Sequence, residues 1–265
     1  MSDKNLTLVL MPNCEPRFTP PYVYERYAEP CMNGRIIHGI KRFIERRMDT
    51  IETLDIRWTG FEPLLRLDVM EAISIFVRNI LEFYGQRPYR ASLSTTGYFL
   101  DTIRVKKLLS IGIYHYQISL ENPLSESEER IQIPEQVLKN LKEIAALPPE
   151  DDFRVTVYHS VVKDSDLEWF RQEIGNDERI VLKQKPAKKH REASKKTVKE
   201  KKEPRIAYVF HANGEIEVYN METGKGRKTV GEINQYGIAK FYPKQNKTDG
   251  KSEMREENKS VCLDK

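Results

Sequence analysis

Three cysteines are the residues that could hold a metal ion, a cluster or a disulfide. Cys14, Cys31 and Cys262 are widely spaced in the 265-residue chain and form no CxxC pair. A disulfide framework or a structural zinc site is therefore not expected. A site made of Cys14, Cys31 and His38 has irregular spacing, so we interpret the first two cysteines as small residues beside a loop and a helix start.

Polar segments follow each predicted strand and contain the other candidate binding residues. The segments are Met11–Tyr27, Trp58–Leu65, Ser94–Leu100, Ile118–Pro123 and Tyr158–Ser165. In a parallel α/β fold, ligands bind at the carboxyl ends of the strands. The candidate binding residues in these segments are Gly60, Phe61, Glu62, Thr95, Thr96, Tyr158 and Ser160.

The elements that position these segments alternate between strand and helix patterns. Strands are predicted over residues 6–10, 53–58, 89–94, 113–120, 153–162 and 179–182. Helices are predicted over residues 33–48, 68–84, 101–110, 134–147 and 165–174. Strands separated by single helices pair in parallel through right-handed crossovers. The pattern therefore predicts an α/β fold, either an open doubly wound sheet or a partial (β/α)5–6 TIM-like barrel.

Charge and hydropathy divide the chain into segments. Residues 183–205 contain eleven Lys and Arg against three Glu, a net charge of +8. Since the whole chain carries +4, the remainder carries −4. We expect a barrel over 1–182, a dispensable basic linker over 183–205, a small C-terminal β-hairpin appendage over 206–242 and a disordered tail over 243–265.

Targeting signals and nucleic-acid binding are not favoured by the sequence. No run of about 18 apolar residues predicts a membrane span, and the N-terminus lacks a signal-peptide pattern, so we expect a cytoplasmic protein without a membrane partner. The basic segment could attract phosphate, but it contains no aromatic residue for base stacking. Nucleic-acid binding is therefore kept only as an alternative.

The segment Met11–Tyr27, MPNCEPRFTPPYVYERY, resembles the first loop of the radical S-adenosylmethionine (SAM) enzymes that modify peptides, PTxxCNFRCxYCYE. The matching residues, without gaps, are Pro12, Tyr22, Tyr24 and Glu25. The three cluster cysteines of the family are replaced by Pro16, Pro20 and Val23. Because a 4Fe-4S cluster of this kind needs three thiolates, the resemblance implies that the cluster is lost.

Four further motifs carry the same resemblance. Gly60–Leu65 matches GGEPLL, Thr95–Leu100 matches TNGYLL, Leu120–Pro123 matches LDGP and Tyr158–Ser165 matches RxNVDKDN. The C-terminal part from Ile206 to Gly237 is similar to the SPASM hairpin of this branch, with Tyr219 at a cysteine position. The resemblance favours the partial barrel over the open sheet.

The departures from the family motifs imply a protein without cofactor. Phe61 replaces a glycine beside SAM, and Tyr158 and Ser160 replace an arginine and an asparagine that hold SAM polar groups. Glu62 is retained but could equally be a capping or loop carboxylate. We expect a pseudoenzyme that works with an active radical SAM peptide maturase, its precursor peptide or both. The alternative is a residual SAM-binding or radical SAM enzyme with non-standard ligands.

Overall fold

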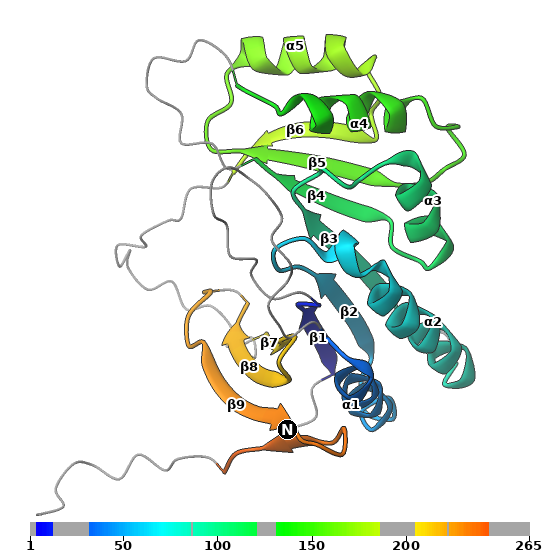
Figure 1. Cartoon of the computed structure of the whole chain (residues 1–265), viewed down its shortest axis with the longest axis vertical. Helices are drawn as coiled ribbons and strands as arrows, with labels where there is room; N and C mark the ends of the chain where they lie inside the picture. The colour runs from blue at the N-terminus through cyan, green and yellow to red at the C-terminus, as the bar shows by residue number, and fades with distance from the viewer. Residues whose placement is uncertain are drawn as a thin grey trace, which may run out of the picture.

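A computed structural model describes residues 4–12, 32–85, 87–120, 131–185, 205–221 and 223–243. These residues form one ten-stranded sheet with the strand order β10-β9-β8-β7-β1-β2-β3-β4-β5-β6 (Figure 1). The first part contains β1 (Asn5–Leu10), α1 (Gly34–Glu45), β2 (Thr53–Trp58), a 3-10 turn (Pro63–Arg66), α2 (Leu67–Phe83) and β3 (Tyr89–Thr95). The second part contains α3 (Thr102–Ser110), β4 (His115–Ser119), α4 (Glu135–Ala145), β5 (Arg154–His159), α5 (Asp164–Ile174) and β6 (Ile180–Gln184).

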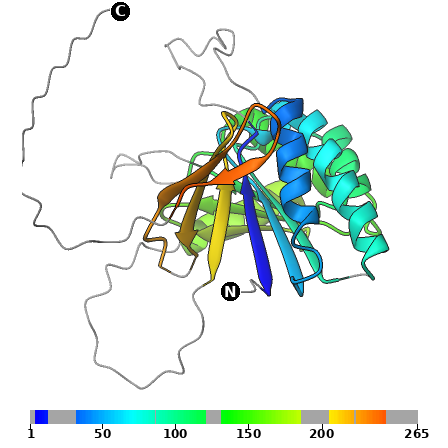
Figure 2. The ribbon, with the colours of Figure 1, turned by 90° about the horizontal axis from the view of Figure 1, so that it is seen from below.

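The strands β1 to β6 are all parallel, as the alternation of strands and helices predicted. Most of the buried strand residues are apolar and pack in one core with the helices; examples are Leu8, Ile56 and Leu93. The five helices cover one face of the curved sheet (Figure 2). A doubly wound sheet has helices on both faces. The arrangement is therefore a partial, open barrel, and this fold prediction is confirmed.

Local sequence signals account for the ends of several helices. The side chains of Asn33 and Asp101 accept hydrogen bonds from the backbone N–H groups of Ile36 and Arg104, and so cap α1 and α3. Gly175 ends α5 with a φ of 76°, a left-handed conformation that glycine adopts without cost. None of the helices in the described ranges is long and apolar enough to cross a membrane.

The C-terminal strands belong to the same sheet as the barrel strands. They are β7 (Ile206–Phe210), β8 (Glu215–Asn220), β9 (Lys228–Ile233) and β10 (Ala239–Phe241). β7 and β8 form an antiparallel hairpin within the range 206–242 for which a hairpin was predicted. However, β7 pairs in parallel with β1, a contact that the sequence did not predict. The hairpin is therefore an extension of the barrel sheet, with two further strands beyond it.

Close packing holds this extension against the first helix. A Cβ atom added to Gly39 of α1 would lie 2.7 Å from Cγ2 of Ile233 in β9, so only glycine leaves room for this contact. A Cβ atom added to Gly231 would lie 2.3 Å from the backbone oxygen of Lys240 in β10. Phe43 of α1 also meets the rings of Tyr208 and Phe210 edge-on. The C-terminal strands and α1 thus share one core.

The basic segment begins later than its charge pattern indicated. Strand β6 continues through Gln184, because Lys183 and Gln184 pair with Tyr158 and His159 of β5. The predicted start of the linker at residue 183 is therefore two residues too early. The rest of the predicted linker up to residue 204, and the predicted tail beyond residue 243, lie outside the described residues.

Candidate functional site

Glu62 is the centre of the candidate site at the carboxyl end of the sheet. It follows β2 and the turn at Gly60, whose φ of 116° is accessible to glycine but strained for other residues. The side chain of Glu62 is fully buried. One carboxylate oxygen accepts a hydrogen bond from the backbone N–H of Leu64 at 3.2 Å and so caps the 3-10 turn.

The carboxyl end of the neighbouring strand β3 supplies further donors to this carboxylate. The hydroxyl of Thr95 lies 2.8 Å from both carboxylate oxygens. Thr96 donates from its backbone N–H at 3.0 Å and from its hydroxyl at 2.5 Å. Since an ionised carboxylate accepts hydrogen bonds only, these donors match its chemistry and compensate its burial. The structure thus brings Glu62, Thr95 and Thr96 together, and we call these three residues the Glu62 junction.

Asn140 of α4 anchors the loop that follows the junction, a contact that the motifs did not predict. Its side-chain amide donates to the backbone oxygens of Gly97 and Tyr98, both at 2.9 Å, and the residue is buried. Gly97 itself has a φ of 86°. A polar residue on the apolar stripe of the predicted helix is the sequence signal that could have identified Asn140.

The last two candidate binding residues, Tyr158 and Ser160, do not join the Glu62 junction. Tyr158 is half-buried near the end of β5, and Ser160 is exposed just beyond the strand. No hydrogen bond between these two side chains and the junction occurs in the described part of the chain. Phe61, beside the junction, is half-buried. Of the predicted binding residues that the structure describes, Glu62, Thr95 and Thr96 are therefore hydrogen-bonded together, whereas Tyr158 and Ser160 are not bonded to them.

His159 is a buried residue near this end of the sheet that the motif comparison passed over. Its Nδ1 atom lies 2.6 Å from the backbone oxygen of Val161 and 3.3 Å from the backbone nitrogen of the same residue. Its Nε2 atom is buried without a hydrogen-bond partner in the structure. Asp166 supports the same loop by accepting from the backbone N–H groups of Lys163 at 2.8 Å and Ile131 at 3.2 Å.

The metal-ligand predictions concern residues that the structure does not describe. Cys14, Pro16, Pro20, Val23 and Cys31 lie in the undescribed range 13–31, and Cys262 lies beyond residue 243. Within the described ranges, no three His, Cys, Asp or Glu residues are grouped so that they could hold a metal ion. The loss of the iron–sulfur cluster therefore remains a prediction from the sequence.

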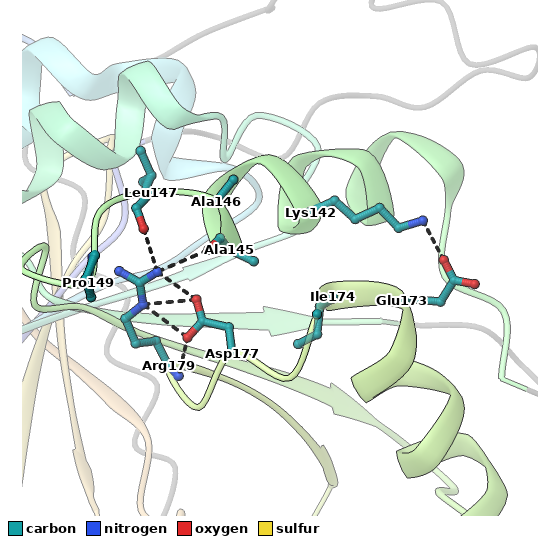
Figure 3. Close-up of a pocket in the computed structure, with 10 residues that line it drawn as sticks. Lys142, Ala145, Ala146, Leu147, Pro149, Glu173, Ile174, Asp177 and Arg179 are labelled. Atoms are coloured by element: carbon teal, nitrogen blue, oxygen red, sulfur yellow. Dashed lines mark hydrogen bonds and ion pairs between the residues drawn. The ribbon is translucent and has the colours of Figure 1, made fainter.

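A second charged residue, Arg179, lines a cavity of about 710 Å³ between α4 and α5, on the opposite end of the sheet (Figure 3). Its guanidinium binds both carboxylate oxygens of Asp177. It also donates to the backbone oxygens of Ala145, Leu147, Pro148 and Asp151. The donors of Arg179 are therefore engaged in closing the end of α4, and the cavity offers no reactive group from this residue.

Comparison with known proteins gives the following similarities. No protein-family model matches the chain. Among solved structures, the chain is similar to anSMEcpe with bound AdoMet, at 14% identity and a TM-score of 0.45, over 72% of this chain and 54% of that chain. It is similar to BtrN in complex with AdoMet and 2-DOIA, at 17% identity and a TM-score of 0.41, over 79% and 71% of the two chains.

A third solved structure is Streptococcus suis SuiB bound to S-adenosylmethionine. It is similar at 13% identity with a TM-score of 0.39, over 86% of this chain and 61% of that chain. The chain spans about half the length of anSMEcpe.

Proposed function

We propose that this chain is a radical-SAM-like protein without an iron–sulfur cluster that serves as a partner or peptide-binding module of an active peptide maturase. The proposal starts from the first-loop register, in which Pro16, Pro20 and Val23 stand at the three cysteine positions. None of these side chains has an atom that can bind iron, and proline also lacks a backbone N–H.

The observation that carries the proposal furthest is the hydrogen bonding of Glu62. Its buried carboxylate accepts from Leu64, Thr95 and Thr96. A ligand ammonium group could bind this carboxylate only in competition with donors that are already in place. The retained acidic residue is thus explained by the folding of two adjacent loops, and it needs no ligand to account for it.

A second candidate is a residual SAM-binding protein, favoured by the positive φ of Gly60. The value of 116° gives the backbone after β2 a turn that permits close approach of a ligand. Titration calorimetry with SAM separates the two candidates. Undetectable binding at millimolar SAM supports the proposal, whereas micromolar affinity that persists in Phe61→Gly and is lost in Glu62→Gln favours the second candidate.

The partner role is tested by co-expression with a cysteine-intact homologue and its precursor peptide. We expect a co-purifying complex or a higher yield of modified peptide than the homologue gives alone. The control is the same homologue with an unrelated protein of similar size and charge. If this chain stays monomeric, binds neither protein nor peptide and leaves the yield unchanged, the partner role is refuted.

A further inference from the structure

The two faces of the strands β2–β6 differ in chemistry. Residues such as Ile56, Tyr116 and Val157 point to the helices and belong to the core. The residues between them point to the opposite face, which we call the inner face, and are half-buried or exposed. Those at its centre are Ser92, Ser94, Gln117, Ser119, Thr156 and Tyr158. A sheet face of this polarity needs no apolar cover but offers many hydrogen-bonding groups.

Positive charge dominates the inner face. Arg57, Arg90, Arg154 and Lys183 lie at its alternating positions and are exposed. The one carboxylate at those positions of β2–β6 is Asp55, which forms an ion pair with Arg57 at 2.9 Å. In the described residues, no ion pair involves Arg90, Arg154 or Lys183. The inner face therefore carries a net charge of about +3, of which Lys183 belongs to the basic segment; the other inner-face residues carry +2, in contrast to the negative charge of the chain outside that segment.

Strand register places these cations across the whole width of the face. Arg57 pairs with Ser92, Ser92 with His115, and His115 with Arg154. Four residues closer to the carboxyl end of β5 than Arg154, Tyr158 pairs with Lys183 on β6. With about 4.8 Å between adjacent strands, the distance from β2 to β6 is roughly 19 Å. An extended peptide of about six residues covers that distance.

We infer that the inner face binds an acidic, extended peptide whose carboxylates contact Arg90, Arg154 and Lys183. The inference rests on the proposed function, which gives the chain a peptide partner, and adds the charge and the binding surface of that peptide. The hydroxyl and amide groups between the cations supply hydrogen bonds to peptide backbone. A single aromatic residue, Tyr158, lies among the inner positions of β2–β6, so base stacking has little support there.

The test is fluorescence anisotropy on the full-length protein with labelled ten-residue peptides of alternating Glu-Gly or Lys-Gly. We expect the Glu-Gly peptide to bind and the Lys-Gly peptide not to bind, with weaker binding as NaCl rises from 50 to 300 mM. The double variant Arg90→Glu/Arg154→Glu should lower the affinity at least tenfold. Both residues are exposed, and circular dichroism verifies folding.

The matched control reverses two exposed cations on the helices, Lys106→Glu/Lys139→Glu. This variant changes the net charge equally and should retain the affinity within about twofold. Equal losses in the two variants, or no loss in either, overturn the inference and place binding elsewhere, for example on the basic residues that follow Lys185. A labelled ten-nucleotide single strand that binds the inner face more tightly than the peptide also overturns it.

The outcome is separable from that of the proposed function. If the maturase co-purifies with the wild type while the acidic peptide does not bind, the inner-face inference fails and the partner role stands. If the peptide binds as expected but neither maturase nor precursor associates, the partner role fails and the inner-face site stands.

Discussion

At each end of the sheet, a charged side chain connects neighbouring loops through hydrogen bonds, and the two charges have opposite sign. At the carboxyl end, the anionic Glu62 collects hydrogen bonds from two loops, and at the other end the cationic Arg179 binds Asp177 and four backbone oxygens. A cavity lies at Arg179 and the family motifs lie at Glu62, yet both charged groups are engaged within the fold. A charge whose hydrogen-bonding groups are engaged within the fold therefore indicates a structural role, while the exposed Arg90, Arg154 and Lys183 of the inner face are available for binding.

Removing Arg179 should give the largest loss of stability. Arg179→Met keeps the stem of the side chain but removes the guanidinium donors from four carbonyl groups and from Asp177, which keeps the backbone N–H of residue 179. We expect a loss of about 4 kcal/mol in the free energy of unfolding, measured by urea denaturation. The control is Arg171→Met, an exposed arginine on α5, which should change stability by about 0.5 kcal/mol or less. A similar small effect at Arg179 would refute its structural role.

Truncating Glu62 should have the next largest effect. Glu62→Ala leaves the buried donors of Thr95 and Thr96 without an acceptor, so we expect a loss of about 3 kcal/mol. Exposed Glu82 on α2 gives the control, Glu82→Ala, with an expected change near zero. If Glu62→Ala is as stable as the wild type, the carboxylate is reserved for a ligand and the residual SAM-binding candidate gains support.

Strain at Gly60 should be measurable but smaller. Gly60→Ala forces an alanine to a φ of 116°, for which we expect a loss of about 1 to 3 kcal/mol by urea denaturation. Gly34, which starts α1 with open space around its α-carbon, is the control, because Gly34→Ala meets no atom within 4 Å. A neutral Gly60→Ala would show that the turn relaxes and is not needed to set the Glu62 junction.

The smallest expected effect is on the acid sensitivity of stability, through Asp177 at the Arg179 end of the sheet. Burial raises the pKa of Asp177, but its hydrogen bonds and the charge of Arg179 outweigh that effect and lower the pKa below its ordinary value. A carboxyl with a lowered pKa stabilises the fold above its unfolded pKa of about 4, and this contribution is lost as pH falls through the folded pKa. Stability between pH 4 and pH 2 should therefore fall less steeply in Asp177→Asn than in the wild type. Parallel curves would contradict this.

The sequence predicted the local elements better than their long-range placement. Hydrophobic periodicity located the parallel strands and their helices, because each helix packs one apolar stripe on the strand pair beside it. The β1–β7 pairing joins residues about two hundred positions apart, and no local pattern specifies such a contact. The end of β6 was misplaced because Lys183 and Gln184 are polar residues that continue an edge strand.

The candidate site was predicted in part for similar reasons. The motifs brought Glu62, Thr95 and Thr96 to one end of the sheet, since the carboxyl ends of neighbouring parallel strands meet there. They could not predict that Thr95 and Thr96 would both donate hydrogen bonds to Glu62. His159 was missed because its contact is with a backbone oxygen, which carries no sequence signal. Asn140 could have been noticed as a polar residue on an apolar helix stripe, but its backbone partners could not be predicted.

Iron binding tests the central claim most directly. After anaerobic incubation with excess ferrous iron and sulfide and removal of unbound metal, we predict well below one iron per chain and no charge-transfer absorbance in the visible range. The triple variant Pro16→Cys/Pro20→Cys/Val23→Cys, which restores the three thiolates, provides the matched comparison. About four irons per wild-type chain, the content of one cubane cluster, would contradict the account.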